Sequence, residues 1–238
     1  MSSVSIIIPV WREGDRVAKL LKFFSKCFSG ELVVVLTEGD KETELPLHSG
    51  MVIIISKRRG RAFQMNEGAK FATGDILLFL HADTIIPTHT IPTLGKKLKI
   101  YDAVAGAYKL EIDAAGWIYR LIEFGVDIRS RFFGLPYGDQ AIFIKRILFE
   151  NIGGYNELAL MEDVDLIRRI HRVGRIIYEK GGTARTSSRR WEKNGPIKTT
   201  IKNWILISAF YFGFDTKKLA KFYYDCRSGV NNKVRDSR

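Results

Sequence analysis

Residues 76–84 read ILLFLHADT, an unbroken apolar run that ends in a histidine and an aspartate. A short apolar run of this kind is typical of a strand that is buried on both faces of a parallel sheet. Similar apolar, β-branched runs occur at residues 4–10, 31–36 and 51–56. We therefore expect four strands, the last of which spans residues 76–81.

Amphipathic stretches of helical length separate these runs. Apolar side chains recur at helical spacing in residues 15–28 and 61–72, which predicts two crossover helices. Strands that alternate with helices indicate an α/β fold with a mostly parallel central sheet and flanking helices. The rhythm loosens after Pro87, where we expect a helix at 89–100, a strand at 103–112, a helix at 115–131 and a glycine-rich turn at 133–139.

The composition excludes several classes of protein. The chain has 238 residues, of which 46% are hydrophobic and 27% charged, values that exclude a disordered chain and a coiled coil. Its net charge of +12 favours anionic partners such as nucleotide phosphates, lipid headgroups or nucleic acid. Cys27 and Cys226 form no C-x-x-C pair, and residues 4–10 read as a strand rather than a signal peptide. These features predict a cytoplasmic protein.

Two acidic segments carry candidate chemistry. His81 and Asp83 follow the fourth strand two residues apart, so in an extended segment they point to one side and suit a divalent metal ion. The alternative is that Asp83 only caps a turn. Glu162, Asp163 and Asp165 begin an amphipathic helix, where acids ordinarily complement the helix dipole, although a carboxylate at such a junction also suits a general base.

Basic residues mark two further segments. Arg58, Arg59 and Arg61 lie between a strand and a helix, where guanidinium groups favour a phosphate, although a solvated turn is the alternative. Arg190 and Trp191 join a cation to an aromatic ring farther along the chain.

These segments, in this order, resemble family 2 glycosyltransferases of the GT-A fold. The opening Pro9-Val10-Trp11-Arg12-Glu13 takes the place of that family's P-V-Y-N-E. The sequence is most similar to a small bacterial subgroup labelled arsenosugar-biosynthesis glycosyltransferases. The motifs that carry this resemblance are Arg59-Gly60-Arg61-Ala62 with Gln64-Met65-Asn66, Leu80-His81-Ala82-Asp83-Thr84, Pro136-Tyr137-Gly138-Asp139-Gln140, Met161-Glu162-Asp163 and Arg189-Arg190-Trp191-Glu192.

The resemblance implies an inverting transfer of a sugar from a nucleotide-diphosphate donor, with a UDP-sugar favoured, to an acceptor hydroxyl. Asp163 would be the catalytic base and Glu162 would orient the site beside it. Asp83 and His81 would hold a divalent Mn²⁺ or Mg²⁺. The donor would be bound by Pro9, Val10, Trp11, Glu13, Glu38, Asp40, Arg59, Arg61, Asn66, Ala82 and Asp83. The acceptor or the diphosphate would be bound by Tyr137, Asp139, Gln140, Arg190 and Trp191.

Two departures from the family pattern concern the donor. The usual D-x-D pair is His81-Ala82-Asp83 here, which removes one carboxylate, and the expected D-D-G-S turn is replaced by residues 37–40. Glu38 and Asp40 both remain candidates to meet the nucleobase, which leaves uracil and guanine open. A sugar nucleotidyltransferase is one alternative function, but the glycine-rich opening that it needs is missing. A non-catalytic basic module for membrane surfaces or nucleic acid is another, although we expect no nucleic-acid partner.

The chain is expected to form one domain at residues 1–227, followed by a polar tail at 228–238. Residues 1–112 would bind the nucleotide and residues 113–227 the acceptor. We expect the segment from Ile197 to Tyr224 to pack two amphipathic helices, with a peripheral membrane contact as the alternative role. Their predicted buried stripe is Trp204, Ile207, Tyr211 and Phe214, with lysines 198, 202, 217, 218 and 221 facing outward.

Overall fold

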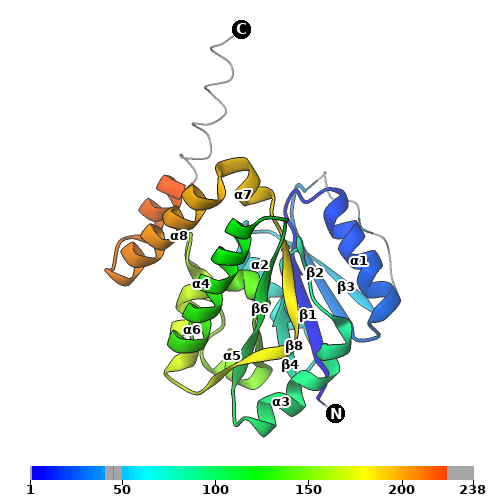
Figure 1. Cartoon of the computed structure of the whole chain (residues 1–238). Coiled ribbons are helices and arrows are strands. Elements are labelled where there is room, and N and C mark those ends of the chain that lie inside the picture. Colours follow the sequence, from blue (N-terminus) through cyan, green and yellow to red (C-terminus); the bar gives the residue numbers. More distant parts are fainter. Residues whose placement is uncertain (1, 41–44, 46–49, 224–238) are drawn as a thin grey trace.

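The computed structural model describes residues 2–40, 45 and 50–223, which fold around one mixed sheet (Figure 1). The polar tail at 228–238 and the end of the last predicted helix at Tyr224 lie outside the described residues. In spatial order the sheet contains β3 (Met51–Ser56), β2 (Glu31–Thr37), β1 (Val4–Pro9), β4 (Ile76–Phe79), β7 (Phe143–Lys145), β6 (Ala105–Asp113), β8 (Ile176–Ser187) and β5 (Thr84–Ile85).

The first four strands are parallel, as the apolar runs predict. Ile6, Ile7 and Ile8 of β1 are fully buried, so this strand is covered on both faces. The strand predicted at 76–81 ends at Phe79, and a turn at residues 82–83 follows it. β7 then enters antiparallel between β4 and β6, while β6 and β8 run parallel to each other. The predicted α/β class with a mostly parallel sheet is confirmed.

Helices cover both faces of the sheet (Figure 1). On one face α1 (Asp15–Cys27) buries its predicted apolar side, including Leu21 and Phe24, against β1 and β2. On the other face lie α2 (Arg61–Phe71), α5 (Arg146–Asn151) and α6 (Glu162–His171), whose apolar residues form a second core with Ile7 and Leu77. The sheet therefore holds the loops at its strand ends between two packed layers.

The second half of the chain adds the remaining helices. The helix predicted at 89–100 is a 3₁₀ segment, η1 (Thr88–Thr93), followed by α3 (Leu94–Ile100), because Pro92 lacks the N–H that an α-helix interior requires. The helix predicted at 115–131 is α4 (Trp117–Phe133). A short turn, η2 (Gly138–Gln140), leads into β7. The chain then forms α7 (Arg189–Asn194) and α8 (Pro196–Tyr211), and residues 216–223 are again helical.

The predicted buried stripe of α8 is wrong except at Ile207, which is partly buried and packs against the cluster that contains Leu206. Trp204 is 62% exposed and Tyr211 is 42% exposed, and Phe214 beyond the helix is exposed as well. The residues that α8 buries are Thr199 and Leu206, on the opposite side. Within residues 2–40, 45 and 50–223, no helix has both the length and the apolar character needed to cross a bilayer.

Candidate active site

The loops after β1 and β2 meet at the carboxyl edge of the sheet. The backbone N–H of Arg12 donates a 3.0 Å hydrogen bond to the Asp40 carboxylate, which joins the two loops. The guanidinium of Arg59 lies 4.1 Å from the ring centre of Trp11, so the loop after β3 stacks on the loop after β1. Trp11, Asp40 and Arg59, three of the predicted donor-binding residues, therefore lie at one edge of the sheet.

The side chain of Gln64 holds the loops after β1 and β2 in place through two hydrogen bonds. Its side-chain amide donates to the backbone carbonyls of Val10 at 2.8 Å and Val35 at 2.7 Å, at the ends of β1 and β2. Gln64 is buried, so its hydrogen bonds satisfy two backbone carbonyl groups that water cannot reach. The sequence analysis included Gln64 only as part of a motif, and its positioning role depends on contacts that are distant in sequence.

Several predicted donor residues are part of the scaffold. Val10 and Ala82 are buried in the core beneath the loops, and Pro9 is the last residue of β1. Glu38 is exposed on the turn after β2, where its backbone N–H donates to Ser56. Asn66 bonds in both directions with the backbone of Tyr155, at 2.8 Å each, and so fixes the segment that leads to α6.

Arg61 connects the donor loops with α6. Its guanidinium lies 3.5 Å from a carboxylate oxygen of Glu162, across the start of α2 and the start of α6. Asp163 and Asp83 also lie close enough to act on Arg61 electrostatically. Burial raises the pKa of the Glu162 carboxyl, and the adjacent Arg61 opposes that shift. Arg61 is thus the cation between the two predicted acidic groups.

Asp163 faces the turn at η2. Its Oδ2 accepts a 2.7 Å hydrogen bond from the backbone N–H of Gly138, and its Oδ1 accepts one from Val164 at 2.8 Å. A Cβ added at Gly138 would lie 3.1 Å from Oδ2 of Asp163 and 3.0 Å from Nε2 of His81. Glycine at 138 therefore lets the carboxylate and the imidazole approach the same point. Met161, just before Glu162, has a φ of 68°, a left-handed conformation that turns the chain into α6.

The imidazole ring of His81 lies close to Gly138 and is neutral. Burial, with Arg61 and Arg190 nearby, holds the pKa of the His81 imidazole well below its ordinary range. In the part of the chain that the structure describes, its Nε2 is buried and has no hydrogen-bond partner. Buried polar atoms are ordinarily hydrogen-bonded, so the unpartnered Nε2 of His81 is a candidate contact for a ligand.

The predicted acceptor residues around η2 divide into two kinds. Gln140 is buried, accepts hydrogen bonds from Arg129, Ser130 and the Tyr137 backbone, and donates to the Tyr108 carbonyl at 3.0 Å. It therefore shapes the turn from inside. Arg129, which sequence reasoning missed, also stacks over the ring of Tyr137 at 3.7 Å.

Asp139 differs from Gln140 because one of its carboxylate oxygens is buried without a hydrogen-bond partner among the described residues. Burial raises the pKa of Asp139, and the charge of Asp163 acts in the same direction, whereas Arg129 and Arg190 oppose the shift. Arg190 is held by a 2.7 Å bond to Asn203 of α8. Asp139 and Arg190 thus lie close to each other, with Asp163 near Asp139 and His81 near Arg190.

Trp191 is buried in a cluster with Leu110 and Ile112 of β6. This packing fixes the start of α7 against the sheet and with it the neighbouring Arg190, and the contact of Trp191 with acceptor or diphosphate stays a prediction. The ring N–H of Trp191 is buried and lacks a partner within residues 2–40, 45 and 50–223.

The predicted metal site contains one well-placed carboxylate. Asp83 lies in the turn after β4, where its carbonyl accepts a bond from Ser187 and its carboxylate acts on Glu13 and Arg61. Among the residues that the structure describes, no three His, Cys, Asp or Glu side chains are grouped to hold a metal ion. Mg²⁺ commonly binds through one or two carboxylates together with substrate phosphates. The donor set fits that mode and does not form an all-protein cage.

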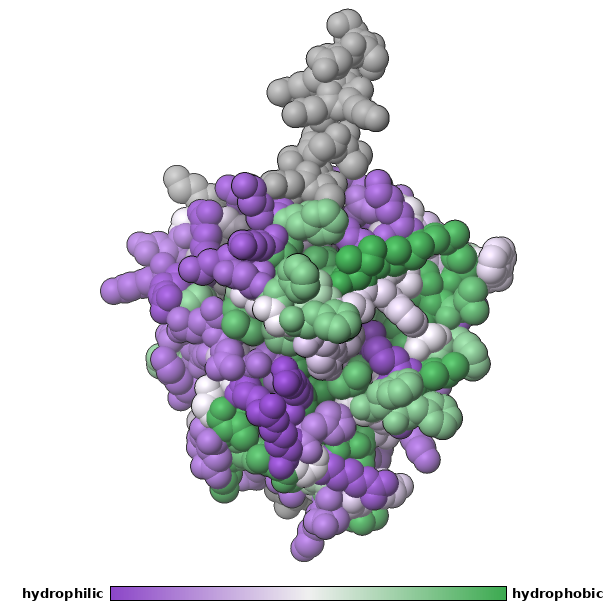
Figure 2. All heavy atoms as spheres, turned by 90° about the vertical axis from the view of Figure 1, so that its left-hand side faces the viewer, coloured by the Kyte–Doolittle hydropathy of each residue, from purple (hydrophilic) through white to green (hydrophobic). Residues whose placement is uncertain are grey.

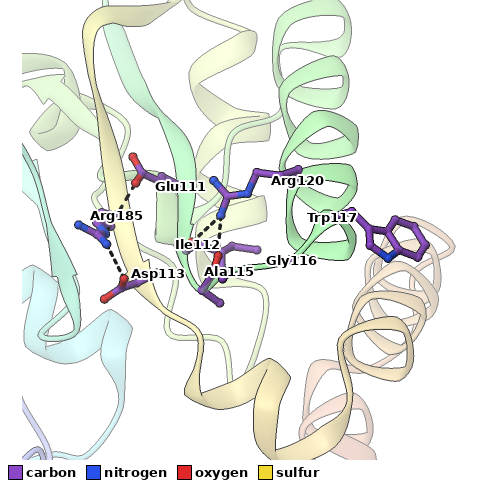
Figure 3. Close-up of a pocket in the computed structure, with 9 residues that line it drawn as sticks. Glu111, Ile112, Asp113, Ala115, Gly116, Trp117, Arg120 and Arg185 are labelled. Atoms are coloured by element: carbon purple, nitrogen blue, oxygen red, sulfur yellow. Dashed lines mark hydrogen bonds and ion pairs between the residues drawn. The ribbon is translucent and has the colours of Figure 1, made fainter.

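A polar pocket of about 450 Å³ opens at the ends of β6 and β8 (Figure 3). Arg185 pairs there with Asp113 at 2.6 Å and with Glu111 at 3.6 Å. Arg120 donates to the Ile112 carbonyl from the first turns of α4. Asp113 is the register partner of Ser187 on β8, and the backbone N–H of Ser187 donates to the Asp83 carbonyl, so β8 separates the pocket from the predicted metal ligand. No motif in the sequence predicts this pocket.

A family model described as Glycosyl transferase family 2 matches residues 5–156. The chain belongs to this family, which confirms the predicted class, glycosyltransferase. A comparison with curated proteins finds no match.

Among solved structures, the fold is similar to that of S. aureus TarS 1–349 in complex with UDP-GlcNAc, with a TM-score of 0.58 and 16% identity over 78% of this chain and 58% of that one. TarS 1–349 in complex with UDP gives the same TM-score and identity over 84% of this chain and 66% of that one. The chain thus spans little more than half of the UDP-GlcNAc-bound TarS segment.

Proposed function

We propose that this protein transfers a sugar from a nucleotide-diphosphate donor to an acceptor hydroxyl, with inversion at the anomeric carbon. The observation that carries the proposal is the convergence of Asp163 and His81 at Gly138, with Arg61 near both side chains. Ligands of open α/β sheets bind beyond the carboxyl ends of the strands, which is where these loops lie. Two TarS structures of the same fold contain UDP-GlcNAc and UDP, which supports a UDP-sugar as donor.

In the proposed reaction the donor lies on residues 1–112, with the nucleotide on Trp11 and Asp40 and the diphosphate near Arg61. The leaving diphosphate gains negative charge as the glycosidic bond breaks, and the Arg61 guanidinium stabilises that charge. The acceptor lies on residues 113–227, beside Asp139 and Arg190. Asp163 removes the proton of the attacking hydroxyl, and the oxygen bonds to the anomeric carbon opposite the leaving group.

Several further residues support the proposed reaction by holding in position the groups that take part in it. Gln140 and Arg129 hold the turn that carries Gly138 and Asp139, and Asn66 holds the segment before α6. Glu162, paired with Arg61, keeps the guanidinium beside Asp163. The motifs shared with arsenosugar-biosynthesis glycosyltransferases support a place in that subgroup.

A divalent Mn²⁺ or Mg²⁺, held by Asp83 with His81 nearby, would neutralise part of the diphosphate charge when it is bound. Calorimetric titration with UDP tests this assignment. We expect weaker binding with EDTA than with Mn²⁺, and we expect Asp83→Asn to abolish the difference. Equal UDP affinity of the wild-type protein with and without metal would contradict the metal assignment and leave the sugar transfer to be tested separately.

A further inference from the structure

The helix α4 exposes an apolar stripe to solvent. Five exposed side chains recur along it at spacings of three and four residues, namely Trp117, Leu121, Phe124, Ile128 and Phe132. Residues at this spacing lie on one side of a helix. Glu123 and Ser130, on the other side, are buried. The solvent-exposed face of α4 is therefore apolar.

The helix α8 carries a second stripe of the same kind. Ile197, Ile201, Trp204 and Ile205 are exposed, whereas Leu206 on the opposite side is buried. A shallow groove of about 450 Å³ runs between the side chains of this stripe. Exposed apolar residues continue past the helix at Phe212 and Phe214.

The two helices that carry these stripes lie next to each other on one side of the molecule (Figure 1). Helices α4 and α8 contact each other, and Figure 2 shows hydrophobic residues gathered on this side with hydrophilic residues next to them. We call the two stripes together the α4–α8 face. More than half of the large apolar side chains that are exposed in the described residues belong to it or to the segment that follows α8. Soluble monomers rarely expose large apolar patches, and such patches commonly mark a binding surface.

The charge around the α4–α8 face indicates which partner fits. Residues 193–223 contain six lysines and one acid, Asp215. Lys198 follows Ile197 directly, and Lys217 and Lys218 are exposed shortly after Phe214. Tryptophan and lysine are the residues that concentrate at the surface of lipid bilayers. A symmetric contact with a second copy would instead bring these lysines toward one another, which costs free energy.

We propose that the α4–α8 face docks onto the surface of an anionic lipid bilayer. Trp117, Phe124 and Trp204 enter the boundary between headgroups and acyl chains, while Lys198, Lys217 and Lys218 contact lipid phosphates. This partner is independent of the sugar-transfer reaction, and its test uses no measurement of activity.

Co-sedimentation with vesicles of phosphatidylcholine and phosphatidylglycerol tests the proposal. The wild-type protein should bind and should stay bound in part when salt is raised to about 0.5 M, where exposed charges are largely screened. Phe124→Gln with Trp204→Gln should weaken binding by about tenfold or more, because each ring loses its burial in lipid. Lys217→Gln with Lys218→Gln should weaken it by about fivefold per lysine in low salt.

Ile55→Gln with Phe71→Gln provides the matched control, since both side chains are large, apolar and exposed but lie outside the α4–α8 face. Binding by this control should stay within about twofold of wild type. The proposal is overturned if the wild-type protein does not bind anionic vesicles, if salt removes binding completely, or if the control loses as much as the α4–α8 variant. A dimer that Trp204→Gln abolishes, in a protein that ignores vesicles, would assign the face to a second copy and overturn it too.

Discussion

The backbone N–H of Gly138 donates a 2.7 Å hydrogen bond to Oδ2 of Asp163 and so ties the turn at η2 to the first turn of α6. The two residues are 25 positions apart, and each comes from a different predicted motif. The bond fixes the orientation of the carboxylate that we assign as the base. A Cβ at position 138 would make close contacts with Asp163 and His81, so both side chains would have to shift.

Asp163→Asn should remove the base and keep the shape of the site. Turnover should fall by about 10²- to 10⁴-fold, the usual contribution of general-base catalysis. UDP affinity, measured by calorimetry, should change by less than about twofold, because the diphosphate is placed beside Arg61 and not on Asp163. Asp102→Asn is the control, since Asp102 is exposed and its φ of 46° suits asparagine equally well. A variant at 163 that keeps more than about a tenth of wild-type turnover would disprove the assignment.

Gly138→Ala should damage activity more than folding. The new Cβ would lie 3.0 Å from His81 Nε2 and 3.1 Å from Asp163 Oδ2, so both groups must move. We expect turnover to fall by about tenfold or more and the free energy of unfolding to fall by about 1–3 kcal/mol. Thermal unfolding and product formation measure the two effects.

Gly125→Ala serves as the comparison for that substitution. Gly125 lies within α4, and nothing surrounds its Cβ position within 4 Å. Alanine there should raise the free energy of unfolding by up to about 1 kcal/mol, because glycine is a poor helix former. Full activity in Gly138→Ala would show that the close approach at 138 has no part in the reaction.

Asn66→Ala should destabilise the protein through the segment before α6. It removes both 2.8 Å hydrogen bonds to the Tyr155 backbone and leaves that backbone partly buried without partners. The expected loss is about 2–4 kcal/mol in the free energy of unfolding, read from urea denaturation. Asn151→Ala, at an exposed position, should cost less than about 0.5 kcal/mol. Equal losses of stability at positions 66 and 151 would show that the two hydrogen bonds between Asn66 and the Tyr155 backbone do not hold this segment.

Asp139→Asn should stabilise the fold in a pH-dependent way. Burial raises the pKa of Asp139, so the folded protein favours the protonated carboxyl, and ionisation at neutral pH lowers stability. Removing the charge should therefore raise Tm at about pH 7, and the gain should shrink as the pH falls toward about 4, the ordinary range for aspartate. A gain in Tm that grows as the pH falls would contradict a raised pKa of Asp139. Activity should fall in the same variant, because Asp139 faces the proposed acceptor.

The first half of the fold could be predicted because its signals are local. The apolar run at 4–10 and the helix pattern at 15–28 each determine an element without reference to the rest of the chain. The shared carboxyl edge then follows from the geometry of parallel strands. The shared role of Trp11, Asp40 and Asp83 in binding the donor came instead from the resemblance to family 2 glycosyltransferases.

The rest of the fold and of the site depends on tertiary contacts, which the spacing of apolar residues along the sequence does not reveal. A pattern of apolar residues in α8 shows that one face is apolar, but not whether that face turns inward, and Trp204 turned out to be exposed. Gln140 looked like a substrate contact because it lies in a motif, yet its bond to Tyr108, 32 residues away, makes it a positioning residue. The stacking of Arg129 on Tyr137 has no signal in the sequence at all.

Calorimetric titration of the wild-type protein with UDP in the presence of Mn²⁺ tests the central claim, that these loops bind a nucleotide-diphosphate sugar, most directly. We predict one saturable site, and Arg61→Ala should weaken binding by about tenfold or more, because a charge-assisted contact to the diphosphate is lost. Arg58→Ala is the matched control, since Arg58 pairs with Glu157 at 3.3 Å on the surface, and it should change affinity by less than about twofold. The account is contradicted if no nucleoside diphosphate binds, or if Arg58→Ala weakens binding as much as Arg61→Ala.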